Sequence, residues 1–264
     1  MQHDPNKVVV VLSGGQDSTT CLYWAIQQGY DVHCVTFDYG QRHRRELAAA
    51  HTVAIHAGLG NKHEIITIGD VLQGTSPLVN KTKTLEQYQD FHSLPGGLEK
   101  TFVPMRNQLF LTIAANRAYV LGSNKLVTGV CQEDFGGYPD CRRKFIDLLE
   151  FACCQGTFTG EVDTLPPLEI LTPLMYMTKA ESVKLAVELP GCYDALAYTH
   201  TAYDGNYPPN GKDHASLLRA KGFEEAGVPD PLVLRAVVEG LMELPVAPNY
   251  QGDMDEWFHK AMAS

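Results

Sequence analysis

The sequence lacks any apolar run long enough to cross a membrane, and it is short of positive charge. Its 21 Lys and Arg residues stand against 31 Asp and Glu residues, which gives a formal net charge of −10. Binding along a nucleic acid needs clustered cations, so this balance argues against a broad nucleic-acid-binding face. We expect a protein that neither spans a membrane nor binds nucleic acid.

Paired cysteines are also missing. The seven cysteines are an odd number and include no Cys-x-x-Cys pair. Neither a disulfide framework nor a redox pair is therefore indicated. Residues 1–7 are polar and do not have the pattern of a signal peptide. These features predict a protein of the reducing cytoplasm.

The strongest local pattern lies near the N-terminus. Residues 8–12 are apolar and mostly β-branched, which predicts a short buried strand, and residues 21–28 predict an amphipathic helix that ends at Gly29. The small residues 13–15 separate the two. A turn of this kind directs backbone N–H groups and the positive end of a helix dipole toward one point, which suits a phosphate.

Hydroxyl and carboxylate side chains surround this turn. Ser13, Ser18 and Thr19 can donate hydrogen bonds to a phosphate. A carboxylate such as Asp17 needs a metal ion such as Mg²⁺ between itself and phosphates. No Gly-Lys-Ser or Gly-Lys-Thr follows, so the turn is not a Walker A loop. The alternative is an ordinary strand-to-helix turn in which Asp17 or Ser18 caps the helix.

Strands and helices alternate along the rest of the chain. Further strands are predicted at 32–37, 64–68, 125–128 and 168–171, and helices at 44–59, 109–121, 178–189, 214–226 and 231–244. This alternation predicts an α/β fold with a parallel sheet. Such sheets bind ligands at the carboxyl ends of their strands, where the turn at 13–15 lies. Residues 70–104 have no strong period and form either a lid or an insertion.

Isolated polar residues mark the same edge of the predicted sheet. Asp38 and Arg42 lie in the polar turn that follows the strand at 32–37. Arg106 stands near the start of a helix, where the dipole disfavours a cation, so a role in holding an anion is favoured. Lys179 lies in a capping box and is long enough to reach a phosphate. The alternative for both cations is a solvated side chain.

Another polar turn, residues 129–142, follows the fourth strand. Carboxylates such as Asp134 and Asp140 can accept the amino and ring N–H groups of a purine-like base, and Phe135 or Tyr138 can stack on it. The alternative is an acidic loop in which Asp140 caps the next helix.

Four segments together resemble the 7-cyano-7-deazaguanine synthase (QueC) family of the N-type ATP pyrophosphatases, the PP-loop superfamily. They are Leu-Ser-Gly-Gly-Gln-Asp-Ser-Thr-Thr at 12–20, Val-Thr-Phe-Asp-Tyr-Gly-Gln-Arg-His at 35–43, Thr-Phe-Val-Pro-Met-Arg-Asn at 101–107, and the whole of 129–142. The likeness covers residues 8–223, and the segment 129–142 is specific to this family.

The resemblance implies an adenine-nucleotide α-hydrolase-like, Rossmann-like domain in residues 1–190, with an irregular and helical segment in 191–264 packed on it. It implies a ligase that uses ATP and Mg²⁺. The carboxylate of 7-carboxy-7-deazaguanine attacks the α-phosphate of ATP, and ammonia displaces AMP to give an amide. Adenylation of the amide oxygen and elimination then give the nitrile. The family tends to pair subunits, which implies a homodimer.

The same resemblance assigns roles to the residues that match. Those implied to bind ATP and Mg²⁺ are Leu12, Ser13, Gly14, Gly15, Gln16, Asp17, Ser18, Thr19, Asp38 and Arg42. Those implied to act in catalysis are Ser13, Asp17, Ser18, Arg106 and Lys179. Those implied to shape the deazaguanine pocket are Arg106, Asp134, Phe135, Tyr138, Asp140 and Arg142.

One departure from the family concerns zinc. The family carries four zinc-binding cysteines near its C-terminus, and the matching positions here are Ala202, Asn210, Asp213 and Ser216. None is a thiolate, so the usual structural zinc site is not expected. A substitute set would draw on Cys192, His200, Asp213 and His214. We favour the absence of zinc, with packing by Tyr198, Tyr203 and Tyr207 in its place.

The departure leaves the acceptor open. A reshaped C-terminal segment could stop the reaction at the amide, or admit an amine of a protein partner in a conjugating enzyme. The product could then serve antiviral defence or DNA modification instead of tRNA queuosine synthesis. Two further alternatives are a catalytically idle ATP-binding module and a tRNA-thiolating enzyme. The intact segments argue against the first, and the lack of a Cys-x-x-Cys pair argues against the second.

Overall fold

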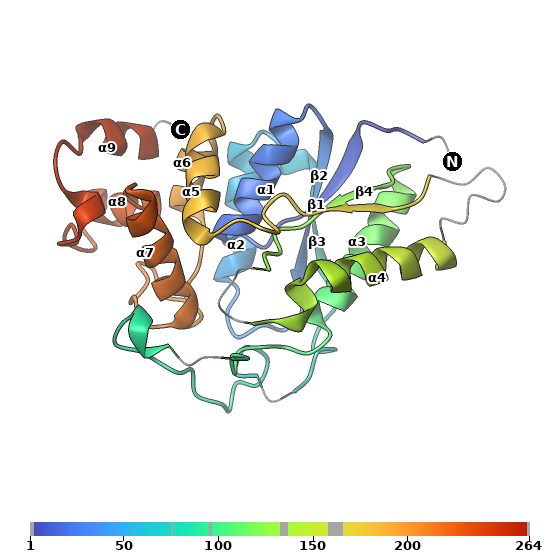
Figure 1. The fold of residues 1–264 in the computed structure, drawn as a ribbon, viewed down its shortest axis with the longest axis horizontal. Helices are drawn as coiled ribbons and strands as arrows, with labels where there is room; N and C mark the ends of the chain where they lie inside the picture. The colour runs from blue at the N-terminus through green and yellow to red at the C-terminus, as the bar shows by residue number, and fades with distance from the viewer. Residues whose placement is uncertain (1–2, 75, 95–96, 133–136, 158–165, 263–264) are drawn as a thin grey trace.

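A five-stranded parallel sheet forms the centre of the protein (Figure 1). The computed structural model describes residues 3–74, 76–94, 97–132, 137–157 and 166–262. The strand order is β3-β2-β1-β4-β5, and every neighbouring pair is parallel. The strands are β1 (Lys7–Val11), β2 (Asp31–Asp38), β3 (His63–Thr67), β4 (Lys125–Val127) and β5 (Glu169–Leu171). The predicted α/β fold with a parallel sheet is confirmed.

The central position of β1 follows from its apolar side chains on both faces. Val8, Val9 and Val10 are fully buried. Val8 and Val10 pack into the core on one face of the sheet, and Val9 packs into the core on the other. Val9 lies in register with His33 on β2 and Leu126 on β4. A strand that is apolar on both faces needs layers of helices above and below it.

Helices supply these layers (Figure 1). The core under Val8 and Val10 includes residues of α1, α2 and α5 to α9, and the core under Val9 includes residues of α3 and α4. Their bounds are α1 (Gln16–Gln27), α2 (Arg45–His56), α3 (Arg106–Val120), α4 (Arg143–Gly156), α5 (Lys179–Glu188), α6 (Cys192–Ala195), α7 (His214–Ala226), α8 (Pro231–Val238) and α9 (Asp255–Ala261). Over the described ranges, no helix combines the length and apolarity that crossing a membrane requires.

Local signals fix where the later helices begin and end. The capping box predicted for α5 is present, because Thr178 Oγ1 accepts from the Glu181 N–H at 3.2 Å and Glu181 Oε2 accepts from the Thr178 N–H at 2.7 Å. The helix predicted at 231–244 ends earlier, at Val238. Gly240, with φ of 71°, takes the left-handed conformation that terminates helices.

The segment 70–104 contains little regular structure. In the described part of 70–104, the only regular element is the single 3₁₀ turn Phe91–Ser93. The segment lies along the lower edge of the view in Figure 1, below α7. The division after residue 190 stays a prediction, although the helices that follow it share one apolar core with the sheet.

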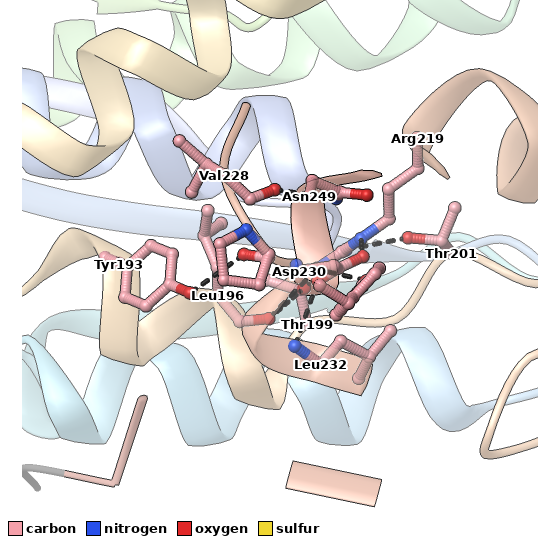
Figure 2. Close-up of polar contacts among 11 residues, drawn as sticks. Tyr193, Leu196, Thr199, Thr201, Arg219, Val228, Asp230, Leu232 and Asn249 are labelled. Carbon is pink, nitrogen blue, oxygen red and sulfur yellow. Dashed lines mark hydrogen bonds and ion pairs between the residues drawn. The ribbon is translucent and has the colours of Figure 1, made fainter. Parts of the chain in front are cut away.

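A buried ion pair ties α7 to α8 (Figure 2). Arg219 donates from Nε and Nη2 to the two carboxylate oxygens of Asp230, at 2.6 and 2.8 Å, and both side chains are at most 5% exposed. Arg219 Nη1 donates to Thr199 and Thr201, at 2.8 and 2.9 Å. Asp230 also caps α8 by accepting from the Leu232 N–H at 2.9 Å. Because Thr201 lines the cavity described below, this pair braces its wall.

Replacing Asp230 by Asn should destabilise the protein strongly. The substitution leaves the Arg219 guanidinium buried without its carboxylate, which costs about 3 kcal/mol of the free energy of unfolding. Urea denaturation followed by circular dichroism measures this loss. The matched control is Asp147→Asn, since Asp147 pairs with Arg143 at 2.7 Å but is 60% exposed. A change within about 0.5 kcal/mol is expected there. Equal losses in the two variants would contradict the account.

Candidate active site

A cavity of about 430 Å³ lies at the carboxyl ends of β1, β2 and β4. Its wall includes Leu12 after β1, Phe37 near the end of β2 and Gly129 after β4. The first turns of α1, α3 and α5 and the segment around Tyr203 complete it. This is the edge at which parallel α/β sheets bind their ligands.

The turn between β1 and α1 presents the start of α1 to this cavity. Gly15 is the N-cap of α1, and no side chain caps the helix. The alternative in which Asp17 or Ser18 caps α1 is therefore wrong. The Ser13 and Ser18 hydroxyls lie 3.0 Å apart, and Ser18 Oγ accepts from the Ser13 N–H at 3.2 Å. The uncapped helix start leaves backbone N–H groups of the first turn for an anion, and the two hydroxyls lie beside them.

Gly14 and Thr19 support the turn from behind. A Cβ at Gly14, whose φ is +84°, would lie 2.5 Å from the Glu46 carbonyl oxygen on α2, so only glycine fits. The Gly14 carbonyl accepts from the His200 N–H at 2.8 Å. Thr19 is fully buried, and its hydroxyl donates to the Gly15 carbonyl at 2.9 Å. The predicted residues of this turn that do line the cavity are Leu12, Ser13, Gly15, Gln16, Asp17 and Ser18.

Asp17 and Lys179 form an ion pair at the cavity wall. Lys179 Nζ on α5 lies 2.8 Å from Asp17 Oδ2 on α1, and both residues line the cavity. The Lys179 side chain is 13% exposed and the Asp17 side chain is 24% exposed. The sequence offers no local link between them, because 162 positions separate them. The fold therefore brings together two residues that the family resemblance assigned to catalysis.

Asp38 and Arg42 lie outside the cavity lining. Asp38 pairs with Arg44. Arg42 Nη1 donates to the carbonyls of Lys83 and Pro77, at 2.9 and 3.4 Å, and so holds part of the segment 70–104. Their assignment to ATP binding stays a prediction.

Arg106 is a half-buried cation at the start of α3. Met105 before it takes the left-handed conformation, with φ of 65°, which is uncommon for a residue other than glycine. Burial disfavours the charged guanidinium, but the hydroxyls of Tyr39 and Tyr138 favour it, and the pKa of Arg106 is raised overall. Tyr203 adds to the same effect. A half-buried guanidinium that lines the cavity is suited to hold an anion there.

Glu46 is a cavity residue that the sequence patterns did not single out. It lies on α2, where burial raises the pKa of its carboxyl to about 7, although nearby Arg106 lowers it. His43 Nε2 lies 3.8 Å from Glu46 Oε1. No local signal marks this residue, because only the packing of α2 against the turn at Gly14 brings it to the site.

Glu46→Gln should change how stability depends on pH. A carboxyl whose folded-state pKa is raised favours folding below its unfolded pKa, and this contribution is lost as pH rises through about 7. Between pH 4.5 and pH 8, the unfolding free energy of the Gln variant should therefore gain about 2 kcal/mol relative to the parent. Urea denaturation across pH measures this. In the exposed control Glu225→Gln, the difference in unfolding free energy between variant and parent should not change with pH. The same lack of pH dependence in Glu46→Gln would show that the pKa of Glu46 is not raised by folding.

The turn at 129–142 is described in part. Tyr138 and Arg142 line the cavity, and Tyr138 Oη lies 2.7 Å from Thr101 Oγ1. Asp140 is buried outside the lining, and burial raises the pKa of its carboxyl. It does not cap α4, whose N-cap is Arg142 without a side-chain cap, so that alternative is wrong. The predictions for Asp134 and Phe135 fall outside the described residues.

The positions of the family's zinc cysteines do not fit a zinc ion here. Ala202 is buried, and Asn210 Nδ2 donates to Asp204 Oδ2 at 2.7 Å. Asp213 accepts from the N–H and the hydroxyl of Ser216, at 3.0 and 2.7 Å. Within the described ranges no three His, Cys, Asp or Glu residues come together as a metal-binding group, so the substitute set is not assembled there.

The parallel sheet and the turn at its carboxyl edge define an α/β protein with a cavity at that edge, and Lys179 and Arg106 both line this cavity. The family model described as "Queuosine biosynthesis protein QueC" matches residues 7–227. The chain belongs to this family. α8 and α9 follow the matched residues.

Curated relatives agree with this membership. A protein named 7-cyano-7-deazaguanine synthase from Gloeobacter violaceus is 50% identical over 86% of this chain and 95% of its own length. Proteins of the same name from Chromobacterium violaceum and Laribacter hongkongensis are 47% and 46% identical. The match to the Chromobacterium protein covers 90% of this chain and 97% of that protein. The match to the Laribacter protein covers 88% of this chain and 96% of that protein.

Proposed function

We propose that this protein is an ATP-dependent ligase that converts 7-carboxy-7-deazaguanine and ammonia into 7-cyano-7-deazaguanine. The observation that carries the proposal is one cavity lined by the uncapped start of α1, the Asp17–Lys179 pair and Arg106. It occurs in a QueC-family chain whose curated relatives are named for this activity.

The chemistry needs positioning and charge stabilisation, with no protein nucleophile. The first turn of α1 and the hydroxyls of Ser13 and Ser18 hold the phosphates that become pyrophosphate. Asp17 offers the carboxylate oxygen that Mg²⁺ prefers, and the ion supplies neutralisation of phosphate charge when bound. Lys179 lies 2.8 Å from Asp17, and so adds a positive charge at the same place.

Arg106 orients the reacting acid. Its fork of N–H donors can hold a carboxylate or the α-phosphate, which repel each other until a cation lies between them. The substrate carboxylate forms a bond to the α-phosphorus as pyrophosphate leaves, and ammonia then forms the C–N bond as the C–O bond to AMP breaks. In a second round the amide oxygen is adenylated, and loss of AMP with the last N–H protons leaves the nitrile.

The remaining predicted roles follow from position. Tyr138 and Arg142 line the cavity and, with buried Asp140, are assigned to the deazaguanine ring. ATP binding by Asp38 and Arg42, and pairing of two subunits, are carried over from the family as part of this proposal.

The stoichiometry of AMP to product tests the function. A nitrile synthase releases two AMP for each deazaguanine consumed, because carboxylate and amide are each adenylated once. A ratio of one would replace the proposal with an amide-forming ligase. AMP release that needs an added protein amine would indicate conjugation, and the absence of substrate-dependent AMP release would indicate an idle ATP-binding module.

A further inference from the structure

A second cavity lies beside the first and contains a buried carboxylate. Its volume is about 480 Å³, and part of its wall comes from the segment 70–104. Tyr203 and His214 line both cavities, so they form the wall between them. Tyr88, whose N–H donates to the Lys212 carbonyl at 2.7 Å, ties the segment to the chain before α7. The second cavity is therefore a neighbour of the reaction site.

Glu99 in this cavity has the features of a cation ligand. Its side chain is 3% exposed, and its Oε2 accepts from the Thr101 hydroxyl. Among the described residues no Lys or Arg forms an ion pair with it, and His214 Nδ1 lies 3.9 Å from its Oε1. A buried carboxylate of this kind is costly unless a positive charge joins it.

The groups around Glu99 are suited to a small N–H donor. The Nε2 atom of His214 is buried and has no hydrogen-bond partner among the described residues. Burial raises the pKa values of Tyr138 and Tyr203, which therefore remain neutral hydroxyls. Ammonium has four N–H donors, and a carboxylate, an imidazole nitrogen and hydroxyl oxygens can accept them.

A line of hydrogen bonds connects this carboxylate to the first cavity. Thr101 contacts Glu99 on one side and Tyr138 Oη, at 2.7 Å, on the other. Tyr138 lines the first cavity, whereas Glu99 and Thr101 line the second. Among the described residues, the side chains of the shared wall separate a small molecule held at Glu99 from the first cavity.

We propose that Glu99, with Thr101, Tyr203 and His214, forms the ammonium-binding subsite of this enzyme, an assignment that rests on the proposed function. Ammonium binds at the Glu99 carboxylate and gives up one proton to water as it leaves, and the resulting ammonia passes the shared wall. Its lone pair forms the C–N bond to the adenylated carboxyl carbon as the C–O bond to AMP breaks. The second proton leaves the nitrogen to water, which completes the amide.

Glu99→Gln tests the subsite in the full chain. The amide preserves the shape and removes the charge, so the KM for ammonium should rise at least about tenfold while the KM for ATP changes by less than about twofold. ATP–pyrophosphate exchange with 7-carboxy-7-deazaguanine precedes ammonia attack and should persist. The control Glu64→Gln removes an exposed carboxylate that pairs with Arg117, and both KM values should stay unchanged.

Each outcome decides between distinct claims. An unchanged KM for ammonium in Glu99→Gln overturns the subsite, and so does loss of the exchange reaction, which would show a general structural role. If the variant does not fold, the melting temperature of the parent protein provides the test. Ammonium chloride should raise this temperature more than sodium chloride does at equal ionic strength. Equal effects of the two salts overturn the subsite. A parent protein without substrate-dependent exchange refutes the proposed function itself.

Discussion

Asp17→Asn should reduce AMP release in the presence of 7-carboxy-7-deazaguanine by about 10³-fold or more. The substitution keeps the shape of the side chain but removes the negative charge that faces Lys179 at 2.8 Å and that is assigned to Mg²⁺. Loss of one preorganised electrostatic group at a reacting phosphate has effects of this size. Initial rates of AMP formation by chromatography measure the loss.

A second Asp–Lys pair provides the control. Asp31 pairs with Lys62. It stands at the first residue of β2, and neither partner lines the cavity. Asp31→Asn should leave AMP release within about twofold of the parent, because an exposed pair contributes little. Turnover by Asp17→Asn at the parent rate would show that the site is placed wrongly.

Arg106→Lys should lower kcat/KM for the acid by about 10²-fold, and Arg106→Met by more. Lysine keeps a positive charge but loses the planar fork that holds two oxygens at once. The surrounding tyrosine hydroxyls are also arranged for a guanidinium, since Tyr39, Tyr138 and Tyr203 all favour its charge. Steady-state kinetics with the acid as the varied substrate measure the effect.

The same helix offers a control for this prediction. Arg117 on α3 pairs with Glu64 at 3.0 Å on the surface, so Arg117→Lys should leave kcat/KM unchanged. Thermal unfolding of Arg106→Lys separates a catalytic effect from a folding defect. A variant that folds normally and keeps the parent kcat/KM would remove Arg106 from the site.

The first strand, its turn and α1 could be predicted from sequence because their signals are local. Residues 8–12 are apolar on both faces, and small residues follow at once. The start of α5 could also be predicted, because both partners of its capping box lie within four residues. These patterns also predicted which edge of the sheet carries the cavity.

The rest of the site depends on contacts between distant segments. Glu46 reaches the first cavity because α2 packs on Gly14. Glu99 reaches the second cavity because the segment 70–104 lies beside the chain before α7. Neither contact leaves a periodic pattern in the sequence. Asp38 has the expected position in the chain, at the end of β2, but it does not line the cavity. Its carboxylate pairs with Arg44 instead.

Mass spectrometry of the small-molecule product tests directly whether this protein converts 7-carboxy-7-deazaguanine into the nitrile. The full chain is incubated with 7-carboxy-7-deazaguanine, ATP, Mg²⁺ and ammonium chloride, and the deazaguanine product is weighed against synthetic nitrile and amide. We expect the nitrile, which differs from the acid by the gain of ammonia and the loss of two waters. An amide that accumulates, or unreacted acid until a protein amine is added, would contradict this expectation.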